Sequence, residues 1–242
     1  MTTDSTPLDW LIRKLERLGP LDDTDRARVA ALPLRIESVP RGAHIVREGE
    51  RPEQCCLLAA GYACRYKSTP DGQQQIVAFE MRGDLLDIQH LLLSRADHSV
   101  RAITDATLGW IPRVDLIRMA WERPNIGHAL WRDTLVDASI FREWVLNVGR
   151  RDARTRIAHM LCEFAARCEA AGLGPVDRLE LPMTQEQIAD ATGLTAVHVN
   201  RTMRALTQEG VIVGRGKQLR IRDWQRLREI AEFDPAYLHA AA

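Results

Sequence analysis

The stretch TQEQIADATGLTAVHVNRTMRAL, residues 184–206, has the pattern of two helices joined by a tight turn. Thr184 is followed three residues later by Gln187, which is the spacing of a capping box at a helix start. Gly193 suits the turn, because a residue without a Cβ atom adopts the left-handed conformation without strain. Thr195 is expected to cap the second helix. The stretch therefore predicts a helix-turn-helix with an inward stripe of Val199, Met203 and Leu206.

The face opposite that stripe carries His198, Arg201 and Arg204. Such side chains suit a helix that lies in the major groove of DNA and contacts bases and phosphates. A plain helical hairpin with a solvated basic face is the alternative. The next residues, TQEGVIVGRGKQLRIRDW from 207 to 224, favour the DNA-binding interpretation. Their apolar run, GRGK turn and alternating apolar residues predict a β-hairpin, which would form a wing after the recognition helix.

The positive charge of the chain is concentrated in this region. Residues 195–222 hold six Lys or Arg and a single acid, Glu209, and so carry a net charge of +5. The whole chain is neutral, with 33 basic and 33 acidic residues. A surface that faces phosphates requires such a local excess of positive charge. We therefore expect double-stranded DNA as a partner.

Length and composition indicate a cytoplasmic protein of two domains. The 242 residues, 45% of them hydrophobic, are enough for a core in each domain. No apolar run approaches the roughly 18 residues of a membrane span, and the N-terminal residues lack the pattern of a secretory signal. Five cysteines, an odd number, suggest a reducing compartment.

The sequence does not favour an enzyme or a metal site. Its seven histidines are scattered without metal-ligand spacing, and it has no P-loop or nucleophile elbow. Asp84 with Asp87 is the best available pair of acid and base groups, and it is a weak one. No catalytic residue and no metal ligand is therefore predicted.

The period of the hydrophobic residues changes along the chain. Between about residues 34 and 116, short apolar runs alternate with turn residues, which predicts a β-roll or sandwich. From about Pro124 a helical pattern runs without a breaker to Gly149. It carries two adjacent stripes, one of them Trp131, Leu135, Ala138, Arg142 and Val145. A double stripe suits a helix that packs on its own domain and on a partner helix, and the alternative is burial in a single core.

We thus expect an α+β fold in three parts. Residues 1–123 would form the β-roll, preceded by a short amphipathic helix. Residues 124–150 would form the central helix, and residues 151–242 the winged helix-turn-helix. This order resembles the cAMP receptor protein and fumarate–nitrate regulator (Crp/Fnr) family of bacterial transcription factors. The roll motifs that carry the resemblance are PRGAHIVREGE (40–50), LLAAG (57–61), DGQQQIVAFEMRGD (71–84) and HSVRAIT (98–104).

The resemblance implies a homodimer formed through the central helix. Its two recognition helices would enter successive major grooves of a palindromic operator. RNA polymerase would be a further partner if the protein is an activator. Membranes are not expected as partners.

The sequence departs from the cyclic-nucleotide-binding members of that family. In those members a Gly-Glu pair holds the ribose and an Arg-Ser pair holds the cyclic phosphate, and here the matching positions are Gly83-Asp84 and His98-Ser99. His98 lacks the bidentate fork that an arginine offers to a phosphate. We therefore expect no cAMP or cGMP binding and leave the effector open. An oxygen-sensing iron–sulfur cluster is not expected either, because no cysteine precedes Cys55.

Cys55, Cys56 and Cys64 are the chemically distinctive residues of the roll. Neighbours on a strand point to opposite faces, so one of the adjacent pair at most faces the interior. Cys64 follows after a turn and could lie opposite one of them in a hairpin. A thiol redox sensor or a soft-metal site is one hypothesis. Arg65 or Lys67 would assist a redox sensor if either lies close enough to lower a thiolate pKa. Packing of small buried thiols is the alternative.

The recognition helix also departs from the family. Members that read TGTGA-like or TTGAT-like half-sites have a key Glu and other polar residues where this chain has Ala196 and Val197. These two can contact thymine methyl groups but cannot accept from cytosine, so we expect a different half-site. Arg201 matches the family's guanine-contacting arginine. The other predicted DNA contacts are Thr184, Thr195, His198 and Arg204 to phosphates, Asn200 to a base, and Arg215 and Lys217 on the wing.

These observations predict a homodimeric, sequence-specific transcriptional regulator with a sensor roll of unassigned input. The alternative is a constitutive or protein-regulated DNA-binding factor whose roll is only a scaffold. The two differ in whether operator affinity depends on a small molecule or on redox state.

Overall fold

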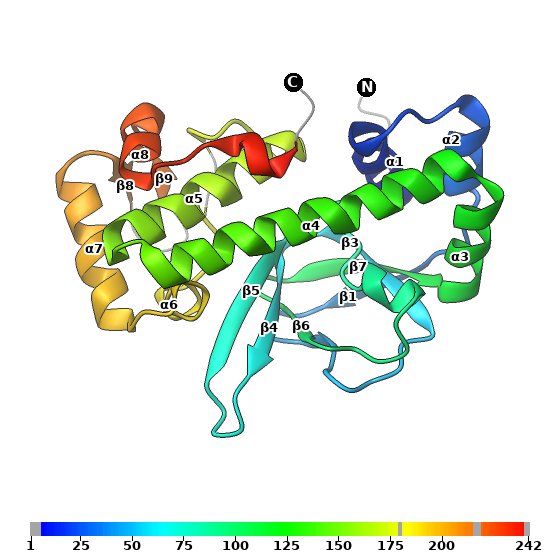
Figure 1. Cartoon of the computed structure of the whole chain (residues 1–242), viewed down its shortest axis with the longest axis horizontal. Coiled ribbons are helices and arrows are strands. Elements are labelled where there is room, and N and C mark those ends of the chain that lie inside the picture. The colour runs from blue at the N-terminus through cyan, green and yellow to red at the C-terminus, as the bar shows by residue number, and fades with distance from the viewer. Residues whose placement is uncertain (1–5, 179–180, 215–218, 240–242) are drawn as a thin grey trace. The chain divides into compact units, whose positions relative to one another are not determined.

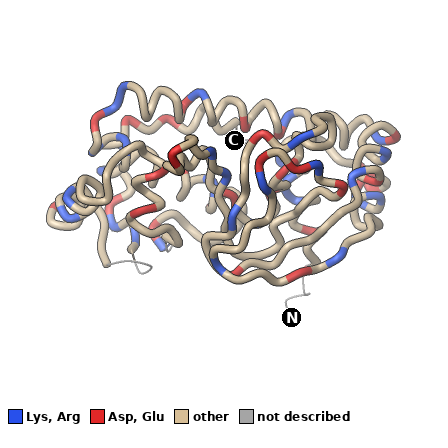
Figure 2. Tube along the Cα trace, turned by 90° about the horizontal axis from the view of Figure 1, so that it is seen from below, with Lys and Arg blue, Asp and Glu red and all other residues tan. Residues whose placement is uncertain are grey.

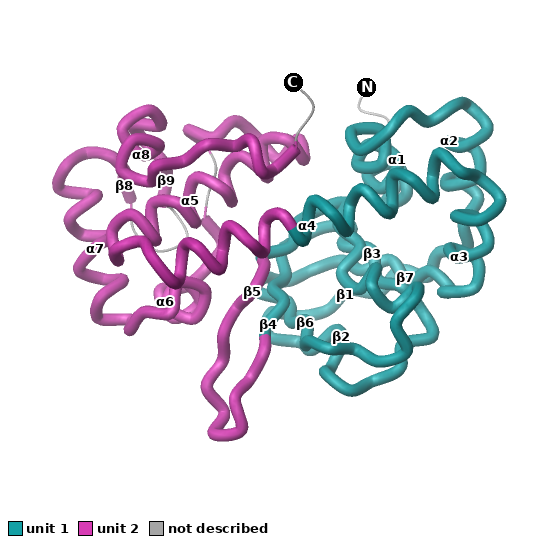
Figure 3. The backbone as a smooth tube through the Cα atoms, in the orientation of Figure 1, with its two compact units in different colours: residues 1–66, 79–138, 240–242 teal, residues 67–78, 139–239 magenta. Residues whose placement is uncertain are grey.

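A computed structural model describes residues 6–178, 181–214 and 219–239 of the chain (Figure 1). Contacts divide it into two compact units (Figure 3). The described part of the first unit comprises residues 6–66 and 79–138, and the second comprises residues 67–78 and the described residues from 139 to 239. The units divide the central helix between them, so the predicted boundaries at residues 123 and 150 stay a prediction.

Seven short strands form the β-roll that the punctuated apolar runs predict. One antiparallel sheet has the order β1-β7-β3, and the other has the order β2-β6-β4-β5. The strands are β1 (Arg35–Val39), β2 (His44–Val46), β3 (Gln54–Ala60), β4 (Ala63–Ser68), β5 (Gln74–Glu80), β6 (Ser99–Ala102) and β7 (Ala106–Pro112). The consecutive strands β3 and β4 thus belong to different sheets. Gly61 turns the chain between them at φ 84°, where an added Cβ atom would lie 2.4 Å from the Asp105 carbonyl oxygen.

Alternation along β3 separates two hydrophobic clusters. Cys56 and Leu58 point into the cluster between the sheets, which also contains Leu108. Cys55 and Leu57 point the other way, into a cluster with the N-terminal helices. Successive side chains on a strand face opposite sides, so one strand builds both cores.

Helices cover the outer cluster of the first unit. The predicted N-terminal helix is α1 (Pro7–Leu18), capped by Thr6. Three further elements were not predicted from the sequence: α2 (Asp23–Ala30), α3 (Arg113–Glu122) and the 3-10 turn η1 (Ile88–Leu91). Helix α2 is held by tertiary contacts: its fully buried Asp25 accepts a hydrogen bond from Arg123 Nε at 2.6 Å. Short helices depend on such contacts more than on their own propensity.

The central helix α4 runs from Pro124 to Arg150, as the apolar period predicts. The stripe Trp131, Leu135, Ala138, Arg142 and Val145 is exposed along its whole length. Trp131 is 65% exposed and Val145 59%. The second predicted stripe contains the buried Leu130 and Trp144 and the exposed Phe141. Its other members are Thr134, Asp137 and Val148. One face of α4 therefore packs within the chain, and the adjacent face presents large apolar side chains to solvent.

The second unit is mainly helical. Its elements are α5 (Ala153–Ala170), α6 (Gln185–Thr192), α7 (Ala196–Gln208), β8 (Ile212–Val213), β9 (Arg220–Ile221), α8 (Trp224–Ala231) and the 3-10 turn η3 (Pro235–Leu238). Strands β8 and β9 pair antiparallel and form the predicted hairpin. No helix within the described residues has the length and apolar composition to span a bilayer.

A buried polar cluster joins α5 to the end of α4 and to η3. Glu163 accepts hydrogen bonds from Trp144 Nε1 and from the Tyr237 hydroxyl, both at 2.8 Å. His159, one turn earlier on α5, stacks on the Tyr237 ring, and its Nε2 lies 3.3 Å from Glu143 Oε1. Burial lowers the pKa of His159 to about 3, and the charge of Arg151 adds to this effect.

Because the fold holds His159 in its neutral form, we expect the chain to be most stable at pH values above the ordinary pKa of histidine. The unfolded chain takes up the proton near pH 6.5, whereas the folded chain resists it down to about pH 3. Stability should therefore fall as the pH drops below 6.5. The free energy of unfolding in urea should be measured between about pH 7.5 and about pH 5. It should decrease less for His159→Phe, which retains a stacked ring, than for the unchanged chain. Exposed His128→Phe is the control, and identical pH profiles for all three proteins would contradict the prediction.

Candidate functional site

The turn between α6 and α7 has the geometry that the sequence predicts. The Thr184 hydroxyl accepts a hydrogen bond from the Gln187 amide at 3.2 Å, and the Gln187 side chain accepts from the Thr184 amide at 2.8 Å. Gly193 lies in the left-handed region at φ 63° and ψ 37°. The Thr195 hydroxyl caps α7 by accepting from the His198 amide. Local capping chemistry thus sets where each helix begins and the angle at which α7 leaves the turn.

Helix α7 has one buried face and one exposed face. Val199, Met203 and Leu206 are buried, as predicted. The outward residues form a continuous exposed surface, which we call the α7 outer face: Ala196, Val197, His198, Arg201 and Arg204. Val197 is 70% exposed. Exposed apolar and basic side chains on one helix face are what contact with thymine methyl groups, guanines and phosphates requires.

Three predicted contacts have additional roles within the chain. Asn200 is half-buried, and its amide donates to Gln185 Oε1 on α6 at 3.0 Å. This bond directs Asn200 toward α6, which weakens its interpretation as a base-reading residue. The hydroxyls of Thr184 and Thr195 serve as caps, so their contact with phosphates stays a prediction. On the wing, Arg215 and Lys217 lie outside the described residues, and the neighbouring Arg220 is exposed on β9.

Arginines that the sequence analysis did not single out hold the helix-turn-helix in place. Arg156 on α5 donates through Nη1 to the Thr192 carbonyl at 2.8 Å, at the end of α6. Arg154 forms a bidentate pair with Glu209, with both bonds at 2.5 Å. Glu209 is the single acid of residues 195–222, so this pair neutralises the one negative charge of the basic segment. Figure 2 marks the basic and acidic positions along the trace.

The Gly83-Asp84 pair of the predicted effector pocket is already engaged. Gly83 takes φ 94°, a conformation that favours glycine. The Asp84 carboxylate accepts from the Met81 amide at 2.8 Å and pairs with Lys14 Nζ at 2.7 Å. The same ammonium lies 3.1 Å from Asp133 of α4. Both carboxylates raise the pKa of Lys14 against the opposing effect of its burial, so the lysine stays charged.

The His98-Ser99 pair is engaged as well. His98 Nδ1 lies 2.7 Å from the Asp97 carboxylate, and the Ser99 hydroxyl accepts from the Glu48 amide at 3.0 Å. Burial lowers the pKa of His98, and the nearby charge of Arg65 lowers it further. A neutral imidazole at the phosphate position offers no charge to a cyclic phosphate.

The three cysteines of the roll are buried and do not form one group. Cys55 and Cys56 face different clusters, and Cys64 pairs with Arg101 of β6 in the other sheet. The prediction that Cys64 lies opposite Cys55 or Cys56 in a hairpin is therefore wrong, because β3 and β4 belong to different sheets. Cys55 Sγ donates to Asp87 Oδ1 at 3.0 Å. Burial and the Asp87 charge raise the pKa of Cys55 and of Cys56, which disfavours the reactive thiolate.

Comparison with known protein families gives two matches. The family model described as a Crp-like helix-turn-helix domain matches residues 155–230. The family model described as a cyclic nucleotide-binding domain matches residues 36–122. The first range contains the α7 outer face, and the second contains most of the β-roll.

Individual proteins match over most of the chain. The transcriptional activator protein FnrL of Cereibacter sphaeroides is 31% identical over 202 residues, which are 81% of this chain and 80% of that protein. The nitrogen fixation regulation protein FixK of Azorhizobium caulinodans is 27% identical over 78% of this chain and 76% of its own length. The structure of FixK2 from Bradyrhizobium japonicum is similar with a TM-score of 0.74 and 27% identity, over 82% of this chain and 98% of that one.

The burial of the cysteines predicts slow reaction of the native thiols. In the folded chain, modification by dithionitrobenzoate should be at least about 100-fold slower than in urea, because burial and a raised pKa both suppress the thiolate. The urea-unfolded chain is the control and should show all five thiols. A native thiol that reacts as fast as the unfolded ones would contradict this prediction and restore the redox-sensor hypothesis.

Proposed function

Because the chain belongs to the Crp/Fnr family of bacterial transcriptional regulators, we propose that it reads a palindromic DNA operator as a homodimer and without a cyclic nucleotide. Members of this family regulate transcription and are not enzymes. The observation that carries the proposal is the α7 outer face, where Arg201 and Arg204 stand exposed beside Ala196 and Val197.

Each residue of the α7 outer face has a role in this proposal. Arg201 donates two parallel hydrogen bonds to a guanine. Ala196 and Val197 contact thymine methyl groups, so the half-site differs from those that require a glutamate here. His198 and Arg204 bind phosphates and set the register, together with Thr184 and Thr195. Arg215 and Lys217 add affinity that depends on salt but not on sequence.

The exposed stripe of α4 supports the homodimer. Five large apolar side chains of α4 are more than 40% exposed: Trp131, Leu135, Phe141, Val145 and Leu146. Contiguous exposed apolar surface marks an interaction site, and a second copy of the same helix offers a matching stripe. In this proposal residues 1–123 form the roll, 124–150 the dimerisation helix and 151–242 the DNA-binding domain.

The residues at the predicted nucleotide site already pair within the chain, which supports regulation without a cyclic nucleotide. Asp84 pairs with Lys14, and His98 offers no charged fork to a phosphate. The three roll cysteines act as packing residues in this proposal, because they are buried and separated. FnrL is named an activator. We extend that role to this chain, which would act in the cytoplasm with RNA polymerase as a partner.

Arg201→Ala should abolish the preference for the operator while leaving the dimer intact. Its guanine contact supplies about 1–3 kcal/mol of discrimination at each half-site. Arg204→Ala is the matched variant on the same face: it should weaken binding to all sequences and reduce the salt slope by about 1. Fluorescence anisotropy with the selected operator and a scrambled duplex measures both. Unchanged operator affinity of Arg201→Ala would refute the docking of α7.

Cyclic nucleotides should not stabilise the protein. A ligand at 100 times its dissociation constant adds about 2.7 kcal/mol to the stability of the folded state. Differential scanning fluorimetry with millimolar cAMP or cGMP should therefore leave Tm unchanged, with 5′-AMP as the matched control. A rise of several degrees with a cyclic nucleotide alone would show that the pocket opens and that the roll is a nucleotide sensor.

A further inference from the structure

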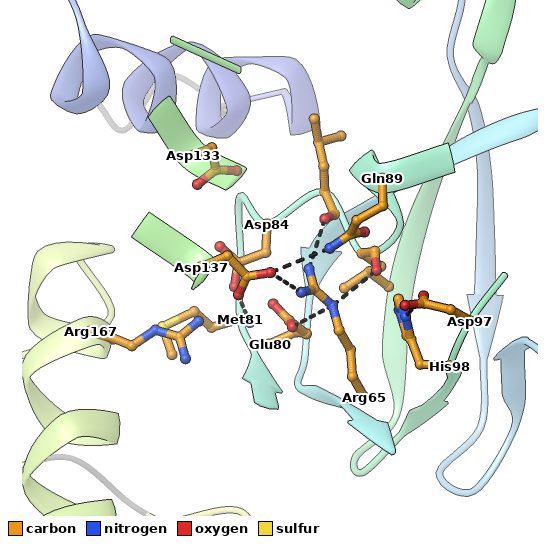
Figure 4. A network of polar contacts seen from close by, with 12 residues as sticks. Arg65, Glu80, Met81, Asp84, Gln89, Asp97, His98, Asp133, Asp137 and Arg167 are labelled. Atoms are coloured by element: carbon orange, nitrogen blue, oxygen red, sulfur yellow. Dashed lines mark hydrogen bonds and ion pairs between the residues drawn. The ribbon is translucent and has the colours of Figure 1, made fainter. Parts of the chain in front are cut away.

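Arg65 of β4 lies inside the roll, between the two pairs of the predicted effector pocket. Its Nε donates to the Leu86 carbonyl at 3.2 Å and its Nη2 to the Leu85 carbonyl at 3.4 Å, directly after Gly83-Asp84. On the other side, its charge lowers the pKa of His98. Figure 4 shows the guanidinium at the centre of the dashed contacts, with His98 beyond it. The side chain therefore interacts with the neighbourhood of both predicted pairs: it contacts the carbonyls that follow Gly83-Asp84 and acts electrostatically on His98.

The guanidinium joins its own strand β4 to β5 and α4 through charged contacts. Its Nε lies 2.9 Å from Glu80 Oε1 at the end of β5, and its Nη1 donates to Asp137 Oδ2 on α4 (Figure 4). Gln89 of η1 donates to the same Asp137 oxygen at 3.3 Å. Glu80 and Asp137 raise the pKa of Arg65 against the effect of burial. The positive charge is thus retained although the residue is only 7% exposed.

Lys14 makes a second connection to the same helix. Its ammonium bridges Asp84 and Asp133, at 2.7 and 3.1 Å. Asp133 and Asp137 are one turn apart on α4, so the two cations hold consecutive turns of one helix face. We call Arg65, Lys14 and the carboxylates of Glu80, Asp84, Asp133 and Asp137 the roll–helix clamp.

We propose that the roll–helix clamp is a built-in substitute for a diffusible effector, with Arg65 as its central positioning residue. Lys14 and Arg65 offset the mutual repulsion of four carboxylates in a largely buried region, and Arg17 acts electrostatically on two of them, Asp84 and Asp133. With these cations in place, the first half of α4 is fixed to the roll by groups of the chain itself. The operator-binding form is then populated without any ligand.

The continuity of α4 explains how the clamp affects DNA binding. The helix is uninterrupted from Pro124 to Arg150, so it connects the turns that carry Asp133 and Asp137 to the residues that precede α5. The inference rests on the proposed function, because operator binding is its readout. It goes further by naming the residues that make an effector unnecessary.

Asp137→Asn in the full-length chain is the first test. The substitution removes the charge at a side chain that is 34% exposed, so the fold should tolerate it. We expect operator affinity to fall about 10-fold, a usual size for coupling between sites, with the dimer and the circular dichroism spectrum unchanged. Glu122→Gln is the matched control, because it breaks an exposed pair with Arg28 in the same unit without touching α4.

Chemical rescue distinguishes positioning from a structural role. Arg65→Gly removes the side chain and leaves room for a small cation. Millimolar methylguanidinium should restore operator affinity to this variant, whereas methylammonium at the same ionic strength should not. A positioning role predicts that Arg65→Gly is folded without methylguanidinium, by circular dichroism and Tm, and that the added cation restores operator affinity; a purely structural arginine would instead be rescued in folding and affinity together.

The outcomes separate the inference from the proposed function. If the protein without substitutions binds no operator, the proposed function and the clamp are both overturned. An unchanged chain that binds, together with an Asp137→Asn variant of equal affinity, overturns the clamp alone. Loss of affinity in Asp137→Asn but not in Glu122→Gln supports the clamp even if Arg65→Gly fails to fold.

Discussion

The buried charge of Arg65 is the constraint on which the arrangement of the first unit depends. A guanidinium inside a β-roll is tolerated only if anionic and carbonyl groups surround it. Glu80, Asp137 and two backbone carbonyls do so, and they come from β5, α4 and the loop after Gly83. The roll, the loop and the helix are therefore held together by one side chain. The same guanidinium also donates to the two carbonyls that follow Gly83-Asp84, the predicted ribose position.

A second principle governs the DNA-binding half, where local rules are sufficient. The capping box at Thr184, the left-handed Gly193 and the cap at Thr195 each involve residues within a few positions of one another. Such features are encoded in short stretches, and the sequence predicts them together with the buried stripe of α7 and the following hairpin. The stripe of α4 could also be predicted from the sequence, because the helical period places its residues on one face. Hydrophobic periods and local helix caps are therefore the features of this fold that the sequence can predict.

The remaining features depend on contacts between distant residues. The clamp joins positions 14, 65, 80, 84, 133 and 137, and no spacing rule connects them. Asp25 of helix α2 pairs with the distant Arg123, although the capping box between Asp22 and Asp25 is a local signal that the prediction from sequence did not use. Cys64 does not lie opposite Cys56 in a hairpin, because β3 and β4 join different sheets. The departure at His98 predicts from the sequence that a cyclic phosphate would bind poorly. The sequence does not predict that Lys14 pairs with Asp84 or that Arg65 pairs with Glu80 and Asp137.

The central claim is that this chain reads two half-sites with no added effector. The purified protein is first unfolded and refolded to remove bound small molecules. Hydroxyl-radical footprinting on a genome-selected operator then tests whether it binds both half-sites without an effector. The account predicts two symmetric protected regions about one helical turn apart at full strength without ligand. Protection that appears only after addition of a small-molecule extract of cells would contradict the account, because the roll would then require a ligand that the clamp is proposed to replace.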